Sequence, residues 1–237
     1  MRRREQRTAA VAALLAAAYN VAVNRVLPPA THVPANLAVA GVLTGVARVA
    51  GRATWADLGM DRGQVRPGLR VGVVASTGAV GVVCLCAAAP ATRRFFADER
   101  VLSASRGAAT YETGIRIPFA TALPEEVVFR GVLLGVLSRS HHPATAIAWT
   151  SGLFGLWHLL PTVDMMRTNP AGDVLPKGWF GHAVAFAGTT AATAAIGAVF
   201  AGLRLRGGSV VAPVMAHTAI NASAYLAARL VGRAQRQ

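Results

Sequence analysis

The chain has 237 residues, of which 54% are hydrophobic and only 14% charged, and its mean hydropathy is positive. Soluble domains carry roughly 25% charged residues, so this composition excludes an ordinary soluble protein. The net charge of +14 does not indicate a nucleic-acid-binding protein, because the basic residues fall between apolar runs and form no single basic stripe. The sequence therefore predicts one membrane domain over residues 1–237, an all-α polytopic transmembrane bundle of about seven spans within a range of six to eight.

The expected spans follow from apolar runs of about 20 residues, the length that crosses a bilayer as a helix. They are residues 8–26, 34–50, 70–89, 115–137, 143–161, 179–203 and 209–230. The longest charged connection, residues 90–114, contains apolar residues among its charges. It predicts a short amphipathic helix along the membrane interface.

The orientation follows from the first loops. Arg2, Arg3, Arg4 and Arg7 precede the first span, further arginines surround the second loop, and only Arg25 lies near the first loop. The positive-inside rule then places the N-terminus in the cytoplasm. The apolar run after MRRREQR has no clear cleavage site, so a retained first span is favoured over a cleaved signal peptide. The expected location is a membrane, the plasma membrane if the cell is bacterial.

The stretch LPEEVVFRG places charged residues inside an apolar span. Glu126 and Arg130 are four residues apart and lie about 40° apart around a helix, so they predict an ion pair. Glu125 is rotated by about 100° from Glu126, which leaves it free for chemistry. Pro124 cannot donate a hydrogen bond to the carbonyl of Ala120 and disfavours helical geometry at the preceding residue. We therefore expect a kink or break at Pro124.

Two later spans carry further polar residues at four-residue spacing. Phe154 and His158 occur in FGLWH, and His217 and Asn221 occur in HTAIN. This spacing places both members of each pair on one helix face. An ionisable group at membrane depth usually faces the bundle interior or a wet cavity. We expect Glu125, His158, His217 and Asn221 to converge on one such cavity.

These residue types suit hydrolysis by activated water. A carboxylate and a histidine can hold a water and remove its proton, while a second histidine and an asparagine supply donors for an oxyanion. No GxSxG motif is present, and neither cysteine lies near a histidine in sequence, so a covalent mechanism is disfavoured.

The cofactor is left open by these residues. Glu125, His158 and His217 would together supply three ligands of a Zn²⁺ ion and leave a fourth position for water. The chain lacks HExxH, however, and the ligands would come from three separate spans. A glutamate-activated water without a metal is therefore favoured over a metalloprotease.

The motifs EEVVFRG, FGLWH and HTAIN resemble the EExxxR, FxxxH and HxxxN motifs of the CPBP intramembrane proteases. This is the group of CAAX prenyl endopeptidases also called the Abi family. The resemblance covers roughly residues 115–225, which become the expected catalytic core. It implies a helical endopeptidase that cleaves membrane-embedded or membrane-anchored substrates, with prenylated peptides among the candidates.

The resemblance also implies roles for the motif residues. Glu125 and His158 would activate the water, and His217 and Asn221 would stabilise the oxyanion. The remaining motif residues would shape the site, Glu126 and Arg130 by their charge and Phe154 as a wall. Two other functions stay open as hypotheses: a small proton-coupled transporter, and a bacteriocin-immunity or scaffold protein without catalysis.

Overall fold

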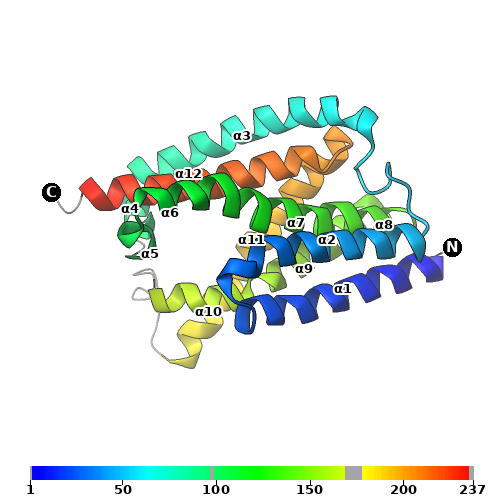
Figure 1. Cartoon of the computed structure of the whole chain (residues 1–237), viewed down its shortest axis with the longest axis horizontal. Coiled ribbons are helices and arrows are strands. Elements are labelled where there is room, and N and C mark those ends of the chain that lie inside the picture. Colours follow the sequence, from blue (N-terminus) through cyan, green and yellow to red (C-terminus); the bar gives the residue numbers. More distant parts are fainter. Residues whose placement is uncertain (1, 97–98, 169–177, 235–237) are drawn as a thin grey trace.

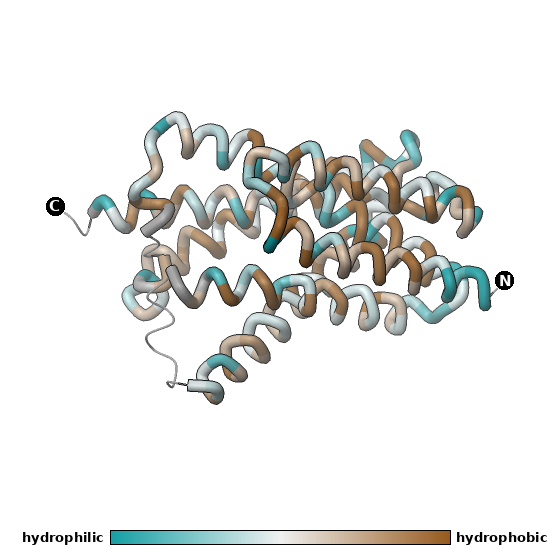
Figure 2. Tube along the Cα trace, turned by 60° about the horizontal axis from the view of Figure 1, so that its bottom comes forward, coloured by the Kyte–Doolittle hydropathy of each residue, from teal (hydrophilic) through white to brown (hydrophobic). Residues whose placement is uncertain are grey.

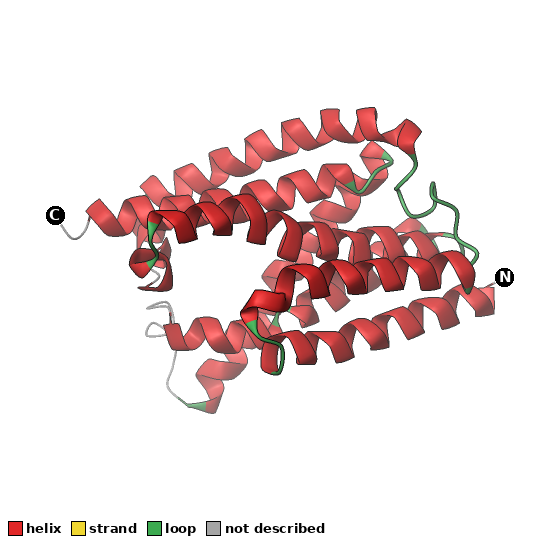
Figure 3. Ribbon diagram, in the orientation of Figure 1, coloured by secondary structure: helices red, strands yellow, loops and turns green. Residues whose placement is uncertain are grey.

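A computed structural model describes residues 2–96, 99–168 and 178–234, and every regular element in those ranges is a helix (Figure 3). The longer helices are α1 (Arg2–Arg25), α2 (His32–Val49), α3 (Val65–Ala88), α9 (Pro143–Trp157), α10 (Leu159–Thr168), α11 (Trp179–Gly207) and α12 (Val211–Ala234). Short helices η1 (Pro29–Thr31) and η2 (Arg62–Gln64) precede α2 and α3. The all-α prediction is confirmed over the described residues.

Each of the seven expected spans coincides with helix, but they differ in how well they suit a bilayer. Among the described residues, Pro29–Val49, Arg62–Ala88 and Trp179–Gly207 are long and apolar enough to cross a membrane. Their apolar side chains point largely outward, as Val74 and Leu85 of α3 do with 75% and 72% of their surface exposed. Apolar side chains turned outward are typical of a lipid-facing helix. The seven-span count itself stays a prediction.

The expected interfacial helix over residues 90–114 is divided into shorter pieces. They are α4 (Pro90–Arg93), η3 (Arg94–Phe96), α5 (Glu99–Ser103) and α6 (Arg106–Tyr111). The Ser105 hydroxyl accepts a hydrogen bond from the Ala108 N–H and so caps α6. From α6 the chain continues directly into the helix that carries the charged motif.

This central helical rod runs from Arg106 to Ser138 and alternates between two hydrogen-bonding patterns. After α6 come the π-helix η4 (Glu112–Ala122), α7 (Leu123–Glu126), the π-helix η5 (Val127–Leu133) and α8 (Leu134–Ser138). The rod packs against α1 and α2 on one side and against α12 on another, and η5 also contacts α9 and α11 (Figure 1). Its charged residues are therefore surrounded by helices from both halves of the chain.

The expected break at Pro124 is wrong. Leu123, the preceding residue, keeps right-handed helical angles of φ −62° and ψ −54°, and the chain continues as helix through Glu126. The amide of Asn36 on α2 donates a hydrogen bond to the carbonyl oxygen of Ala120. Because this donor comes from a neighbouring helix, the carbonyl that Pro124 cannot serve is satisfied while the helix continues.

The remaining helices pack in pairs around the rod. α3 lies along α12, and α9 lies along α11 (Figure 1). The contact between α9 and α11 is close at Gly155, where an added Cβ would lie 2.5 Å from the carbonyl oxygen of Thr190. Small residues at such positions let membrane helices approach closely.

The connection between α2 and α3 is held against the bundle by buried or half-buried arginines from other elements. Arg139, just after α8, donates from Nη1 to the Gly51 carbonyl at 2.7 Å and lies 3.5 Å from the carboxylate of Glu5. Arg204 on α11 donates from Nη2 to the Asp57 carbonyl at 2.9 Å. These arginines tie the first two helices to the later half of the chain at the end that carries the N-terminus.

Candidate active site

Glu126 is the centre of a buried polar network on the rod. Its carboxylate is fully buried, and Oε1 accepts hydrogen bonds from Arg130 Nη1 at 3.1 Å and from His217 Nδ1 at 2.9 Å. The structure thus contains the ion pair that the four-residue spacing predicts. A buried carboxylate is tolerated when it is paired and hydrogen-bonded, and here two donors meet Oε1, while Oε2 is buried without a partner among the described residues.

Arg130 is held in place by partners beyond the carboxylate. Its side chain is 1% exposed, and Nη2 donates to the Gly197 carbonyl of α11 at 3.0 Å. The guanidinium lies 4.0 Å from the ring centre of Phe154 and 5.3 Å from that of Phe200. Cation–π contacts of this kind stabilise a desolvated guanidinium, so Arg130 joins the rod to α9 and α11.

Gly197 is needed where Arg130 meets α11. A Cβ at this position would lie 2.9 Å from Arg130 Nη2 and 3.1 Å from Phe154 Cδ1. Real Cβ atoms do not approach neighbours so closely without a shift of the surroundings. The absence of a side chain at Gly197 therefore allows the guanidinium to reach the backbone.

His217 enters the network from α12. The ring is 5% exposed, stacks on Phe200 with ring centres 5.1 Å apart, and meets Phe154 edge-on at 6.1 Å. Because Nδ1 donates to Glu126, the orientation of the ring is fixed and Nε2 is left for other partners.

His158 terminates α9 and lies on the other side of Phe154. Its ring meets the Phe154 ring edge-on with centres 4.6 Å apart, and Nδ1 lies 2.7 Å from the Phe154 carbonyl oxygen. A hydrogen bond from Nδ1–H to this carbonyl leaves Nε2 as the acceptor of a neutral imidazole. The Phe154 ring thus contacts the rings of both motif histidines.

Glu125 points away from this network toward α1 and α2. Its Oε1 accepts a hydrogen bond from Trp157 Nε1 at 3.2 Å, while Oε2 is buried and has no partner among the described residues. The carboxylate lines a cavity of about 20 Å³ together with Tyr19, Asn36 and Trp157. That volume accommodates about one water molecule.

Asn221 occupies a different surface. It is half-buried and lines a cavity of about 630 Å³ between the rod and α12, together with Glu112, Arg116 and Thr121. Its amide makes no hydrogen bond with the part of the chain that the structure describes. Glu125 and Asn221 therefore line separate cavities, and the expected single cavity is not found between them.

The candidate metal ligands do not form a ligand cluster. Among the described residues, no group of three or more His, Cys, Asp and Glu side chains is arranged to hold a metal ion. Glu125 faces Trp157, whereas the Nδ1 atoms of His158 and His217 face a carbonyl and a carboxylate. Because the three candidate ligands do not form a cluster, no chemical step below depends on a metal.

Several residues of the site carry no motif signal in the sequence. Trp157 and Asn36 support Glu125 and its helix, while Phe200 and Gly197 support His217 and Arg130. Trp157 could have been noticed because it precedes the motif histidine. The others come from helices whose pattern is simply apolar and small, so nothing in their spacing marks them.

The segment that carries this network matches a model of a known protein family. A family model described as type II CAAX prenyl endopeptidase, Rce1-like, matches residues 109–223, a little under half of the chain. Neither the curated proteins nor the solved structures yielded a match. The matched segment contains all three motifs and every residue of the Glu126 network. Over residues 109–223 the chain is therefore similar to the Rce1-like type II CAAX prenyl endopeptidases, the family that its motifs resemble.

Proposed function

We propose that the protein is an intramembrane endopeptidase in which Glu125 and His158 activate a water for hydrolysis of a peptide bond. The observation that carries the proposal is the state of Glu125. One carboxylate oxygen is anchored by Trp157, while the other is buried, unpartnered and next to a cavity that accommodates about one water. A carboxylate with one free oxygen beside a water-sized space suits a general base.

The two adjacent glutamates then have different roles. Glu125 accepts a proton from the water as its oxygen attacks the carbonyl carbon of the substrate. His158, the residue after Trp157, assists this proton transfer through Nε2, the ring nitrogen that its hydrogen bond to the Phe154 carbonyl leaves free. Glu126 contacts neither Trp157 nor His158 through a hydrogen bond; it orients His217 and neutralises Arg130.

The tetrahedral intermediate carries a negative oxygen that needs donors. In the proposal His217 donates from Nε2, with the Glu126 carboxylate at Nδ1 offsetting the charge on the ring. Asn221 donates from its side-chain amide, which has no other partner among the described residues. Collapse of the intermediate breaks the C–N bond, and the proton taken from the water passes to the leaving amine.

The substrate chain is proposed to lie in the larger cavity beside Asn221. Thr121 lines that cavity and lies one helical turn before Glu125, a rise of about 6 Å along the rod. A peptide carbonyl bound between the rod and α12 would lie near the Asn221 amide. Because Glu125 lines a separate cavity, the proposal requires that substrate binding opens a path between the two cavities. The family description points to membrane-anchored substrates, with prenylated peptides as the first class to test.

The decisive experiment is a cleavage assay with purified protein in liposomes, using a panel of membrane-anchored peptides with and without a prenyl group. Glu125→Ala and His158→Ala should each abolish turnover while thermal unfolding stays cooperative. His182→Ala is the matched control, because His182 also places Nδ1 near the carbonyl four residues before it but is exposed on α11. Cleavage that survives both active-site substitutions would sink the proposal.

The same assay separates the metal-free mechanism from a metalloprotease. Wild-type protein is treated with a tight chelator, and its metal content is measured before and after treatment. Turnover that persists in metal-free protein supports activation by glutamate alone. Turnover that disappears on chelation and returns with added Zn²⁺ would assign the water to a metal.

A further inference from the structure

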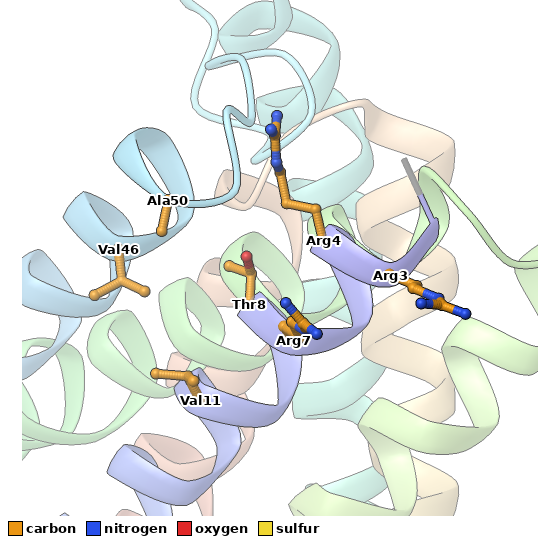
Figure 4. A pocket seen from close by; sticks show the side chains of 7 residues that line it. All are labelled: Arg3, Arg4, Arg7, Thr8, Val11, Val46 and Ala50. Atoms are coloured by element: carbon orange, nitrogen blue, oxygen red, sulfur yellow. The ribbon is translucent and has the colours of Figure 1, made fainter.

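A groove at the N-terminal end of the bundle is lined by three arginines. It lies between α1 and α2, has a volume of about 570 Å³, and its lining residues are Arg3, Arg4, Arg7, Thr8, Val11, Val46 and Ala50, here called the arginine groove. Figure 4 shows that α1 contributes the arginines, Thr8 and Val11, while Val46 and Ala50 belong to the end of α2. A volume of this size is within the range of small-ligand sites.

The charges of the arginine groove are not neutralised within the described part of the chain. Arg3, Arg4 and Arg7 are exposed, and none has a carboxylate partner there. Glu5, which lies between them in sequence, is 1% exposed and turned inward toward Arg139. The acidic side chain of α1 thus points into the protein, and three exposed arginines line the groove, with their side chains pointing in different directions (Figure 4).

The hydroxyl of a mostly buried threonine adds an independent indication of a ligand. Thr8 is 5% exposed, lines the groove and makes no hydrogen bond with any described residue. Two other buried threonines, Thr150 and Thr162, each donate to the carbonyl four residues before them. The Thr8 hydroxyl is not among the fully buried atoms without a partner, so it opens into the groove with its donor and acceptor unused by the described chain.

The position of the groove along the bundle indicates which ligand it would take. The apolar span formed by α2 ends at Val49, next to Ala50 of the groove. Val11 and Val46 continue the groove toward the membrane interior, whereas Arg3 and Arg4 lie at the outer end. This order of basic groups above an apolar wall matches a phospholipid, whose phosphate lies above its acyl chains.

We propose that the arginine groove binds one anionic phospholipid. The arginines hold the headgroup phosphate, for which guanidinium groups provide paired donors. Thr8 supplies a further hydrogen bond, and the first part of an acyl chain lies along Val11 and Val46. The proposal is independent of the peptidase reaction, since the groove shares no residue with the Glu126 network or with the cavity beside Glu125.

The test measures lipid retention by native mass spectrometry on delipidated full-length protein in a neutral detergent at low salt. The probes are phosphatidylglycerol, phosphatidylcholine with the same acyl chains, and inorganic phosphate. We expect one phosphatidylglycerol to bind at least about tenfold more tightly than phosphatidylcholine. The combined Arg3→Ala, Arg4→Ala and Arg7→Ala variant should weaken that binding roughly 100-fold, because each basic residue near a lipid surface contributes about fivefold.

A charge-matched variant separates the groove from the general basic character of this end. Arg62→Ala, Arg66→Ala and Arg70→Ala remove the same number of exposed cations outside the groove. This control should change phosphatidylglycerol binding less than about threefold. Equal weakening by both triple variants would show only nonspecific attraction and would overturn the proposal.

A second variant covers the case in which loss of three arginines prevents folding. Val46→Trp keeps every cation and fills the apolar part of the groove at a half-buried position. It should abolish tight retention of phosphatidylglycerol, and undiminished retention would refute the assignment. Phosphatidylcholine bound as tightly as phosphatidylglycerol would also overturn it, as would full competition by inorganic phosphate, which would indicate a site for free phosphate instead.

Discussion

Glu125 and Glu126 are consecutive in the chain but contact different helices. Glu126 contacts Arg130 and His217 inside the bundle, whereas Glu125 contacts Trp157 on the side of α1 and α2. The angular offset of about 100° between neighbouring residues of a helix accounts for this separation. The chemistry proposed for one residue and the packing role of the other can therefore be tested separately.

The first prediction compares Glu125→Gln with Glu126→Gln. Glu126→Gln leaves the buried Arg130 without its charge partner, so we expect it to destabilise the protein by about 3–5 kcal/mol. Glu125→Gln keeps an amide oxygen that accepts from Trp157, so the unfolding temperature should stay close to wild type while turnover falls. Thermal unfolding in detergent and the cleavage assay measure the two effects. Similar stability losses in both variants would contradict the division of roles.

The second prediction concerns Gly197. Gly197→Ala places a methyl group against Arg130 and Phe154, and overpacking of this kind costs about 1–3 kcal/mol. Gly202→Ala on the same helix is the control, because an added Cβ there meets nothing within 4 Å. The control should be neutral or stabilise the helix by about 0.5–1 kcal/mol. Urea or thermal unfolding of both variants is the measurement, and a harmless Gly197→Ala would show that Arg130 has room to move.

For individual residues, the four-residue spacing in the sequence predicted the pair Glu126–Arg130 but not the partners of Glu125. A four-residue interval defines neighbours on one helix, because the helix geometry is known in advance. Trp157 and Gly197 lie 32 and 67 residues from the side chains that they contact, so their proximity depends on how whole helices pack. Periodicity carries no information about that packing.

The rod between Arg106 and Ser138 shows how a neighbouring helix can override a local rule. Pro124 should bend or end a helix, yet the Asn36 amide serves the Ala120 carbonyl and the rod continues. The expectation of a break was wrong because it considered one helix alone. The π-helical segments on both sides of α7 were also not expected, since no sequence pattern marks them; such segments are frequent at functional sites.

The third prediction tests the contribution of Asn36 to the rod. Asn36→Ala leaves the Ala120 carbonyl without this donor and the Tyr19 hydroxyl without its acceptor, which should cost about 1–3 kcal/mol. In a Pro124→Ala background the restored N–H can serve Ala120, so the same substitution should cost less. A double-mutant cycle of unfolding free energies measures this coupling. Additive effects would mean that Asn36 does not compensate for the proline.

At the scale of the whole molecule, basic residues lie toward both ends of the bundle, and those around the first two spans set the expected orientation. The N- and C-termini lie at opposite ends (Figure 1), and hydrophilic residues gather near both ends while the middle is mainly hydrophobic (Figure 2). The N-terminal end carries Arg2, Arg3, Arg4, Arg7, Arg48, Arg52, Arg62, Arg66, Arg70, Arg139, Arg204 and Arg206. By the positive-inside rule this end should face the cytoplasm.

The fourth prediction tests that orientation with single cysteines. The native Cys84 and Cys86 are replaced by serine, and Ala30→Cys or Arg62→Cys is added at an exposed position of the first or second connection. A membrane-impermeant maleimide should label Ala30→Cys on intact cells and Arg62→Cys only after the membrane is permeabilised. The reverse pattern would place the N-terminal end outside.

The apolar runs predicted where helices form throughout the described chain, because burial in lipid demands satisfied backbone hydrogen bonds. They did not predict which helices contact one another. Residues 109–223 carry all the motifs, and the N-terminal helices showed only compatible hydropathy, yet α1 and α2 line the cavity beside Glu125. Their part in the site is visible only once the helices are assembled.

The arginines that hold the α2–α3 connection have a consequence for how this protein can be divided. Arg139 and Arg204 lie within the segment that the family model matches, but Glu5 and the carbonyls of Gly51 and Asp57 lie outside it. A fragment cut at the edges of the match would lose the acceptors of both arginines, and with them the contacts that join the two halves of the chain. We therefore expect that the segment matched by the family model does not fold as a separate module. A fragment that keeps these contacts would also need residues 5–57, which supply the Glu5 carboxylate and the carbonyls of Gly51 and Asp57.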